Sequence, residues 1–335
     1  MKLLVIILNY RVTDLTIDCL RSLREEVSGT PGFRVAVLEN GTGGDAYLRL
    51  RQAIDENGWG GWVDLTEVHP NRGFTGGNNV VLRRALASAQ PPEYFLLLNA
   101  DTRVAPRALS ALVELMDAQP RAGIAGSTLL SPEGEVQASP FRFPGVLSEF
   151  DRGLRLGVVS KLLAPRWVVP PTPSAACPAE WVSGASMILR RTMLEEIGAL
   201  DEGLYTYFDD VDICLRAHRA GWQVWYAPES RVVHLEGAST GIAQIVKRRP
   251  EYWFEARRRF WLKNHGPLVA ALADAAFLSG FAAWRVRRRI QRKPDPDPPF
   301  MLQDAFRHSV FRTGFAVNEV RNPALAEPPA DEART

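Results

Sequence analysis

The chain has 335 residues, of which 46% are hydrophobic and 23% are charged. This balance excludes an intrinsically disordered chain, and the length suffices for one large domain or two smaller ones with a sizeable core. It also excludes collagen-like, coiled-coil and short disulfide-stapled architectures. Cys19, Cys177 and Cys214 lie far apart without CxxC spacing. We therefore predict no zinc knuckle, no disulfide framework and a reducing compartment.

The net charge of +2 hides an uneven distribution along the chain. Residues 247–293 carry 13 lysines and arginines against three acids, a net charge of +10. The rest of the chain carries 27 against 35, a net charge of −8. One basic segment therefore offsets an acidic body.

The first hundred residues alternate between strand and helix patterns. The apolar run at 3–8 predicts a strand buried on both faces, and it is too short for a secretory signal peptide. A helix capped by Thr13 or Asp14 should follow. Further strands are expected at 34–38, 63–68 and 94–98, and a helix at 79–89. This alternation predicts an α/β fold with a mostly parallel sheet flanked by helices, whose ligands bind beyond the carboxyl ends of the strands.

The second half of the chain is less regular. Residues 140–178 are rich in proline with weak periodicity, which predicts a loop-rich insertion. Regular elements return with strands at 181–190, 223–226 and 232–234, and helices at 192–197 and up to residue 220. The last 42 residues, 294–335, are proline-rich and predict a tail.

Polar clusters follow four of the predicted strands, at 9–11, 39–40, 99–101 and His234. In a parallel sheet they would meet at one edge, where amide, carboxylate and imidazole groups suit a phosphate-bearing ligand and a divalent ion. Taken alone, each cluster is more often an ordinary turn at the end of a strand. Asp101 also fits as the cap of a following helix.

The segment 71–78, NRGFTGGN, opens a predicted helix. Its glycines allow the backbone to approach a ligand closely, and a helix N-terminus favours anions. A plain glycine turn is the alternative. The segment matches neither the GxGxxG fingerprint nor a Walker A loop.

Three carboxylates, Asp209, Asp210 and Asp212, directly follow a group of aromatic residues. Like charges packed beside aromatic rings cost free energy unless a cation, a helix N-terminus or a substrate compensates. Such a cluster can supply a general base whose pKa is raised by its neighbours. A solvated, acid-rich first turn of a helix explains the cluster as well.

In their order along the chain, these motifs resemble family 2 glycosyltransferases of the GT-A fold, and most of all the rhamnosyltransferase-like branch. The resemblance covers about residues 3–265. It rests on ILNY (7–10), LEN (38–40), NRGF with GGN (71–78), LNAD (98–101), VSGA (182–185), LDE (200–202), YFDDVD (207–212) and VH (233–234).

The resemblance implies a division of the chain. A Rossmann-like GT-A catalytic domain would span 1–245, with a nucleotide-sugar half at 1–125, the insertion at 140–178 and an acceptor and catalytic-base half at 180–245. A basic aromatic helical segment at 246–293 and the tail at 294–335 would follow, as a C-terminal helical membrane-associating extension.

The resemblance also implies roles for single residues. Asp210 is expected as the catalytic base, with Asp209 as its acidic neighbour. Asp101 matches the last acid of the DXD metal motif and His234 a histidine beside the metal, which is expected to be magnesium or manganese. The residues expected to bind the donor are Asn9, Tyr10, Glu39, Asn40, Asn71, Gly73, Gly76, Asn78, Asn99 and Gly184.

Three positions depart from the family pattern. Asn99 stands where the first Asp of DXD is common, which keeps an oxygen ligand without its charge. Glu39 replaces the commoner Asp of the pair that binds the base. Arg11 sits where small polar residues are frequent.

The expected activity is inverting, metal-assisted transfer of a sugar such as rhamnose. The donor would be a dTDP- or UDP-linked sugar, and the acceptor a hydroxyl of a glycan or lipid-linked molecule in cell-envelope polysaccharide synthesis. A non-enzymatic module that binds sugar nucleotides or glycans remains an alternative. A nucleotidyltransferase is disfavoured, because Leu8 leads into Asn9-Tyr10-Arg11 and not into a glycine-rich loop with a basic residue.

The basic segment mixes arginines with aromatic residues up to His265, and 267–284 is nearly uncharged apart from Asp274. Eighteen residues reach only the lower limit for spanning a bilayer. We therefore predict a helix in the membrane interface, with arginines on anionic headgroups, in a cytoplasmic protein at the inner face of the membrane. A helix packed on the catalytic domain is the alternative. No nucleic-acid module accompanies the patch, so no nucleic-acid partner is predicted.

Overall fold

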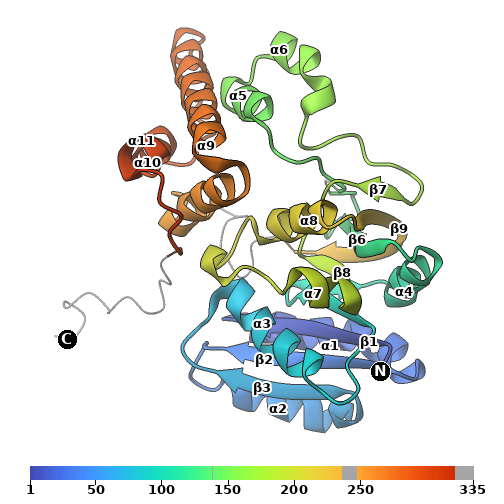
Figure 1. Ribbon diagram of the computed structural model, residues 1–335. Helices are drawn as coiled ribbons and strands as arrows, with labels where there is room; N and C mark the ends of the chain where they lie inside the picture. The colour runs from blue at the N-terminus through green and yellow to red at the C-terminus, as the bar shows by residue number, and fades with distance from the viewer. Residues whose placement is uncertain (138, 236–246, 321–335) are drawn as a thin grey trace, which may run out of the picture.

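The computed structural model describes residues 1–137, 139–235 and 247–320 (Figure 1). Its strands are β1 (Leu3–Asn9), β2 (Phe33–Asn40), β3 (Val63–Val68), β4 (Tyr94–Asn99), β5 (Thr102–Val104), β6 (Ala122–Leu130), β7 (Cys177–Ala179), β8 (Ser186–Arg190) and β9 (Gln223–His234). Its α-helices are α1 (Thr13–Gly29), α2 (Ala46–Glu56), α3 (Gly73–Leu86), α4 (Ala108–Ala118), α5 (Val146–Leu154), α6 (Gly157–Leu162), α7 (Arg191–Ile197), α8 (Asp209–Arg219), α9 (Glu251–Ile290), α10 (Met301–Arg307) and α11 (Val310–Thr313). Short 3-10 turns lie at Trp59–Gly61, Ala164–Arg166 and Glu202–Leu204.

The described strands form one sheet in the order β3-β2-β1-β4-β8-β6-β9-β5, with β7 paired to β9. Strands β1 to β4 are parallel, which confirms the prediction for this half of the sheet. The other half is mixed, because β8 runs antiparallel to both β4 and β6 while β9 is parallel to β6. The strand order reverses between β1 and β4, and in open α/β sheets such a reversal opens a crevice at the carboxyl ends.

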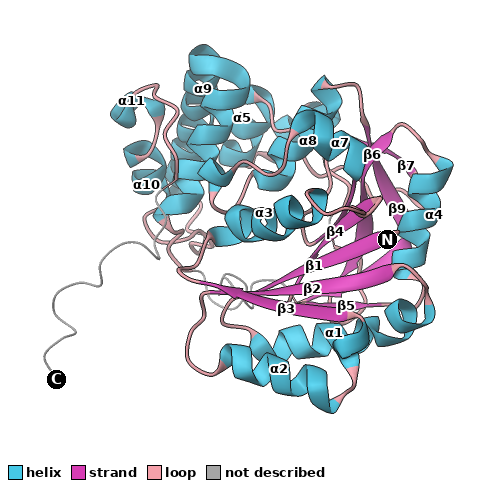
Figure 2. Cartoon of the chain, turned by 60° about the horizontal axis from the view of Figure 1, so that its bottom comes forward, coloured by secondary structure: helices cyan, strands magenta, loops and turns pink. Residues whose placement is uncertain are grey.

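Helices cover both faces of the sheet (Figure 2). Successive side chains of a strand point to opposite faces, so the apolar run of β1 serves two cores. Leu3, Val5 and Ile7 pack in the core that contains residues of α1, α2 and α4. Leu4 and Ile6 pack in the core that contains residues of α3, α7 and α8. The continuous apolar run thus reflects burial on both sides, as predicted.

Two local expectations differ from the structure. The glycine-rich segment is not a turn before the helix, because α3 already begins at Gly73. Asp101 does not cap a helix either, since β5 follows it and α4 begins only at Ala108. Asp101 instead lies in the turn between β4 and β5, and the capping alternative is removed.

The segment predicted as a loop-rich insertion contains α5 and α6, and the predicted tail contains α10 and α11. Helix α5 packs along the second half of α9, and the two cross at a pair of glycines. A Cβ on Gly153 would lie 2.6 Å from the carbonyl oxygen of Phe277, and one on Gly280 would lie 2.6 Å from that of Phe150. Only glycines let the two backbones approach this closely. Residues 321–335 of the predicted tail lie outside the described residues.

Helix α9 carries the basic aromatic segment and bends at Gly266, whose φ is +79°. Of the described helices, this one is long and apolar enough to cross a membrane by length and composition. Only 33% of its most apolar 18-residue stretch is buried in the protein. Its first half packs on α8 through Phe260 and Trp261, which share a core with Val211. The predicted helix is confirmed, and its first half matches the packed alternative.

Candidate active site

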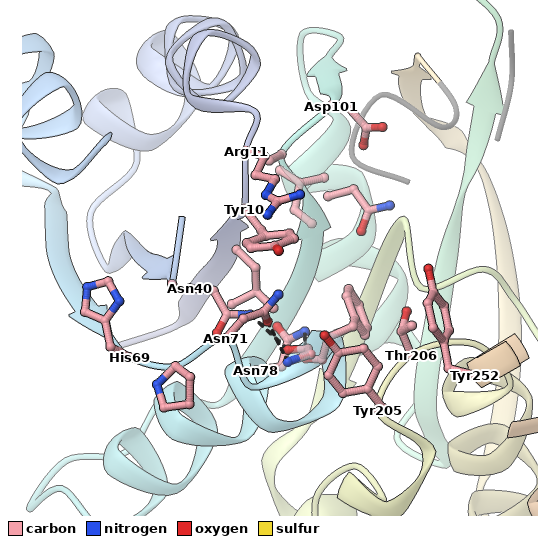
Figure 3. Close-up of a pocket in the computed structure, with 18 residues that line it drawn as sticks. Tyr10, Arg11, Asn40, His69, Asn71, Asn78, Asp101, Tyr205, Thr206 and Tyr252 are labelled. Atoms are coloured by element: carbon pink, nitrogen blue, oxygen red, sulfur yellow. Dashed lines mark hydrogen bonds between the residues drawn. The ribbon is translucent and has the colours of Figure 1, made fainter. Parts of the chain in front are cut away.

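A cavity of about 890 Å³ opens at the carboxyl ends of β1, β2, β3 and β4 (Figure 3). We call it the donor cavity, after the role that the family resemblance implies for this edge of the sheet. It lies at the reversal of strand order, where the sheet topology predicts a ligand site. Its lining comprises Leu8, Tyr10, Arg11, Asn40, Gly41, His69, Pro70, Asn71, Gly73, Phe74, Asn78, Leu98, Asn99, Ala100, Asp101, Tyr205, Thr206 and Tyr252.

Amide side chains at the strand ends shape the wall of this cavity. The amide of Asn40 donates to the Gly73 carbonyl at 3.0 Å and accepts from the Arg72 N–H at 3.1 Å. The side-chain oxygen Oδ1 of Asn71 accepts from the Gly73 N–H at 2.7 Å. Gly73 has a φ of +70°, and a Cβ there would lie 2.4 Å from the ring of Tyr205. The glycine is therefore required both by its backbone and by the contact.

Four residues predicted to bind the donor do not line this cavity, and one of them, Gly184, lines the neighbouring cavity described below. The Asn9 side chain is fully buried and accepts from the Thr16 hydroxyl at 2.8 Å. The Glu39 carboxylate accepts from the N–H groups of Gly41 and Thr42. Gly76 lies within α3. Asn9 and Glu39 thus hold the strand ends against the helix and the turn that follow them.

Asp101, His234 and Asn99 meet at the end of the cavity near β5 and β9. The Nε2 atom of His234 lies 3.4 Å from Asp101 Oδ1 and 3.3 Å from Asn99 Nδ2. Asp101 is 3% exposed, and the Nδ1 atom of His234 is buried without a hydrogen-bond partner among the described residues. Two ligand atoms of one Mg²⁺ ion lie about 3 Å apart. Because the amide of Asn99 can be turned to present its oxygen, this donor set fits a divalent ion.

A second cluster of possible metal ligands lies in the described part of the chain. The ligand atoms of Glu39, Glu67 and His69 all lie within 4.8 Å of one another. Glu67 and His69 are exposed, and Figure 3 shows His69 and Asp101 at opposite sides of the donor cavity. Exposed acidic groups are common without an ion, so this cluster is the weaker candidate.

A second cavity of about 550 Å³ adjoins the first. We call it the acceptor cavity, after the role that the family resemblance implies for the half of the chain that contains Asp210. The two share Phe74, Asn99, Asp101 and Thr206 in their walls. Of the predicted site residues, the acceptor cavity also contains Gly184, Asp209, Asp210 and His234. Its remaining lining comprises Pro144, Glu149, Arg152, Val168, Trp181, Ser183, Gly184, Ala185, Tyr207, Phe208, Asp209, Asp210, Val211, His234, Arg249 and Trp253.

Asp210 lies at the N-terminus of α8 and faces this cavity. Its carboxylate accepts from the Gly184 N–H at 3.3 Å and from the Val211 N–H at 2.9 Å. Burial raises the pKa of Asp210, and these two hydrogen bonds only partly oppose that rise. Burial also raises the pKa of Asp209 well above its ordinary value, and the charges of Asp210 and Asp212 add to the effect. A carboxylate whose pKa is raised is a stronger base than an ordinary aspartate, which suits it to accept a proton.

Asp212, the third carboxylate of the cluster, has a different role. Its carboxylate accepts from Lys263 at 2.9 Å, from Asn264 at 2.8 Å and from Arg216 at 2.9 Å. It is fully buried and does not line either cavity. Asp212 therefore fastens α8 to α9. The alternative of a solvated acidic turn does not hold, because Asp209 and Asp212 are both buried.

The chain just before α8 is held in an unusual conformation. Tyr205, Tyr207 and Phe208 have φ values of +60°, +68° and +59°. Left-handed backbone costs free energy for residues with a Cβ, and such residues cluster at functional sites. Burial raises the pKa of Tyr205 to about 12, with the nearby Tyr10 and Tyr252 adding to it. The strained turn places Asp209 and Asp210 at the cavity wall.

Several lining residues were not predicted from the sequence. Tyr252 and Trp253 come from α9, Arg249 precedes that helix, and Arg152 comes from α5. The alternation of arginine with aromatic residues at 247–261 was the available signal, but it was interpreted as a membrane-facing surface.

Comparison with known families gives two matches. Residues 94–287, more than half of the chain, match the family described as Glycosyl transferase family group 2. Residues 4–164 match the family described as Glycosyl transferase family 2. Together the matched ranges contain every residue predicted for the site.

Two characterised relatives are similar over part of the chain. The N-acetylglucosaminyl-diphospho-decaprenol L-rhamnosyltransferase of Mycobacterium tuberculosis is 28% identical over 158 residues, 44% of this chain and 49% of that protein. Rhamnosyltransferase WbbL of Escherichia coli K12 is 26% identical over 168 residues, 48% of this chain and 60% of that protein. The chain therefore spans about half the length of the curated relatives that it matches.

A solved structure is similar over most of the chain. It is the mannosyltransferase PcManGT from Pyrobaculum calidifontis in complex with GDP-Man and Mn²⁺. The TM-score is 0.53 at 16% identity, and the match covers 93% of this chain and 87% of that chain. At this identity the likeness concerns the fold.

Proposed function

The chain belongs to glycosyl transferase family 2 and has the GT-A fold, and from this premise we propose the reaction that this glycosyltransferase performs. It moves a sugar, such as rhamnose, from a dTDP- or UDP-linked donor to a hydroxyl of a glycan or lipid-linked acceptor. The configuration at the anomeric carbon is inverted. The names of the two relatives support rhamnose and a lipid-linked acceptor as the first candidates to test.

The donor occupies the donor cavity, and the acceptor enters from the acceptor cavity. The acceptor oxygen forms a bond to the anomeric carbon while the bond from that carbon to the diphosphate breaks. Asp210 accepts the proton of the attacking hydroxyl, and its raised pKa suits that step. The products are the glycosylated acceptor and the free nucleoside diphosphate.

A divalent ion, magnesium or manganese, would be held by Asp101 and His234 with Asn99. When bound, it supplies positive charge that stabilises the negative charge developing on the leaving diphosphate. The Mn²⁺ in the complex of the archaeal mannosyltransferase supports an ion of this kind here. Asp101 lies in the wall that the two cavities share, and His234 lines the acceptor cavity.

One observation carries this proposal. Asp101 and Asp210 come from the two halves of the chain and line the same cavity, which shares a wall with the donor cavity. The proposed metal ligand and the proposed base thus face a common space. A module that only binds sugar nucleotides needs no such continuous passage.

A panel of nucleotide sugars, with and without Mn²⁺, tests the donor. The correct donor at a hundredfold excess over its dissociation constant stabilises the protein by about 2.7 kcal/mol, which is seen as a thermal shift. Release of free nucleoside diphosphate with donor and acceptor then separates the enzyme from a binding module. If a nucleotide sugar binds but no free nucleoside diphosphate is released with any hydroxyl acceptor, the transferase proposal is wrong.

We also propose that the helical extension contacts the cytoplasmic face of a membrane. Among the described residues, all exposed large apolar side chains except Met1, Leu48 and Val136 lie between residues 147 and 317. On the second half of α9 they are Leu268, Leu272, Val286 and Ile290. Arg289, Arg292 and Lys293 are exposed beside the last of these. Apolar groups beside cations fit a bilayer that contains anionic lipids.

We expected the basic residues of this segment to lie on lipid headgroups, but some of them form ion pairs within the protein. Arg257 pairs with Glu149, Arg259 with Asp201, and Lys263 with both Asp201 and Asp212. Liposome flotation tests the rest of the proposal. The protein should float with vesicles containing anionic lipid, and Val286→Glu with Ile290→Glu should abolish this. Flotation that the double variant leaves unchanged would contradict a contact through α9.

A further inference from the structure

Two arginines face the acceptor cavity from elements far apart in the sequence. Arg152 lies on α5, and Arg249 lies just before α9. Both pack against Trp253, with guanidinium carbons 5.7 Å and 5.0 Å from its ring centroid. Cations on one aromatic ring are held in place by that ring without losing their charge.

The cations around this wall outnumber their partners. Arg152 donates to Glu149 at 2.8 Å, but Glu149 also accepts from Arg257 at 2.7 Å. Arg257 in turn pairs with Asp274. Arg249 has no carboxylate within 4.0 Å among the described residues, and its buried Nε atom has no hydrogen-bond partner there. Three guanidinium groups thus face two carboxylates. Burial lowers the pKa of Arg152, and the charges of Arg257 and Arg249 lower it further.

The acids of the same cavity do not supply the missing charge. No ion pair of the described residues joins Arg152 or Arg249 to Asp209 or Asp210. Burial and backbone hydrogen bonds, and no cation, set the pKa of Asp210. The positive charge on this wall therefore remains available to a ligand.

The position of the arginines within the cavity indicates which substrate they meet. Neither arginine lines the donor cavity, whereas Asp101 and Thr206 line both cavities. A sugar whose hydroxyl reaches Asp210 would find Trp181 and Trp253 in the same cavity, and aromatic rings suit the apolar faces of sugars. The anionic partner of the arginines is thus carried by the acceptor and not by the donor.

We propose that Arg152 and Arg249 form an anion subsite that binds a phosphate or diphosphate group carried by the acceptor sugar. This inference rests on the proposed function, because it assigns the second cavity to the acceptor. Arginine recognises phosphate oxygens through paired N–H groups, which a lone ammonium group does less well. The subsite would make the enzyme select phosphorylated acceptors over neutral glycans.

Inorganic pyrophosphate tests the subsite without any substrate. It is titrated calorimetrically into the full-length protein in a chelator, so that no metal bridges it to Asp101. We expect wild type to bind it, and Arg249→Gln and Arg152→Gln to weaken binding about 10- to 100-fold each, as for a charge-assisted hydrogen bond. Arg249→Lys should recover part of the loss. Arg248→Gln is the matched control, because Arg248 is adjacent, carries the same charge and pairs with Asp304 outside the cavity. Equal affinity in wild type and Arg249→Gln, or an equal loss in Arg248→Gln, overturns the subsite.

Acceptor kinetics then identify the source of the phosphate. Three acceptors with the same sugar are compared: its prenyl diphosphate, its 1-phosphate and its neutral methyl glycoside. In Arg249→Gln, the ratio of kcat/KM for a phosphorylated acceptor to that for the methyl glycoside should fall about 10- to 100-fold. If this ratio falls for both phosphorylated acceptors, the subsite recognises the phosphate group itself. If it falls only for the prenyl diphosphate, the subsite recognises the lipid-linked form. An unchanged ratio for both overturns the subsite.

These outcomes separate the subsite from the proposed function. If no nucleotide sugar binds or releases its nucleoside diphosphate, the proposed function fails, whatever pyrophosphate does. If transfer occurs but Arg249→Gln does not change the preference for charged acceptors, the enzyme stands and the subsite falls.

Discussion

The donor and acceptor cavities are built in different ways, although they share a wall. The donor cavity is formed mainly by the carboxyl ends of four parallel strands, β1 to β4. The acceptor cavity is formed by α5, α8, the start of α9 and the chain between them. Sheet topology thus fixes the donor side, whereas packing of the helical extension fixes the acceptor side. Variants directed at each cavity should therefore separate donor binding from acceptor use.

The largest separation is expected from Asp210→Asn. The asparagine keeps the size of the side chain but cannot accept the proton, so kcat should fall roughly 10²- to 10⁴-fold. Donor affinity should stay near wild type, because Asp210 does not line the donor cavity. Steady-state kinetics and donor titration measure the two effects.

Asp212→Asn is the control for this prediction. Its carboxylate binds Lys263, Asn264 and Arg216, away from either cavity. Its substitution should lower the free energy of unfolding and leave the turnover of the folded protein close to wild type. A larger loss of kcat in Asp212→Asn than in Asp210→Asn would contradict the assignment of the base.

Gly73→Ala should damage the donor cavity. The added Cβ would lie 2.4 Å from the Tyr205 ring, and the alanine would have to adopt a φ of +70°. Overpacking and backbone strain together should cost about 2–4 kcal/mol and weaken donor binding. Gly43→Ala is the matched control, because Gly43 has a φ of +75° with open space around it. Chemical denaturation should show a clearly smaller loss for Gly43→Ala; equal losses would mean that the contact with Tyr205 is unimportant.

Gly280→Ala should damage the acceptor cavity alone. A Cβ there would press on the backbone of α5 and move Arg152 and Glu149 on that helix, at a cost of about 1–3 kcal/mol. We expect a higher KM for the acceptor and an unchanged affinity for the donor. Ser279→Ala, on the exposed side of the same helix, should change neither constant. A donor affinity that falls as much as acceptor use would show that the two cavities are not independent.

The smallest expected effect concerns pH. Asp210 must be ionised to accept a proton, so activity is lost as the pH falls through its pKa. Because burial raises the pKa of Asp210, the acid limb of kcat/KM should lie above the ordinary aspartate value of about 3.9. The charge of Asp210 helps to raise the pKa of Asp209, so Asp209 keeps its proton while Asp210 ionises, and Asp209→Asn should leave the acid limb near its wild-type position. A clear shift of the limb to lower pH would contradict this order of ionisation.

The contrast between the cavities also explains what the sequence revealed. Strands that alternate with helices predict a parallel sheet, and this places the residues after each strand at one edge. Tyr10, Asn40 and Asp101, which line the donor cavity, were predicted in this way. The same rule also selected Asn9 and Glu39, whose polar groups bind their own turns and helix. The hydrophobic periodicity of the sequence and the place of a residue after a strand do not show whether its polar group faces a ligand or its own turn.

Asp209, Asp210, Gly184 and His234 of the acceptor cavity were predicted, but its arginines and the residues from α9 could not be, because their contacts join distant parts of the chain. Arg257 is 108 residues from Glu149, and Lys263 is 51 residues from Asp212. From composition alone, we expected these cations to form one basic surface that binds lipid headgroups. The structure shows that some of them form ion pairs inside the protein, while Arg249 lines a cavity. Only the tertiary packing distinguishes these roles.

The position of the metal tests the central claim, that Asp101 joins the two cavities into one site. Binding of Mn²⁺ with the nucleoside diphosphate can be followed by electron paramagnetic resonance in wild type, Asp101→Ala and Glu67→Gln. We predict that Asp101→Ala weakens Mn²⁺ binding at least tenfold, because a charged ligand is lost, and that Glu67→Gln leaves it unchanged. Binding that survives Asp101→Ala and is lost in Glu67→Gln would place the metal at Glu39, Glu67 and His69, away from Asp210, and would contradict the account.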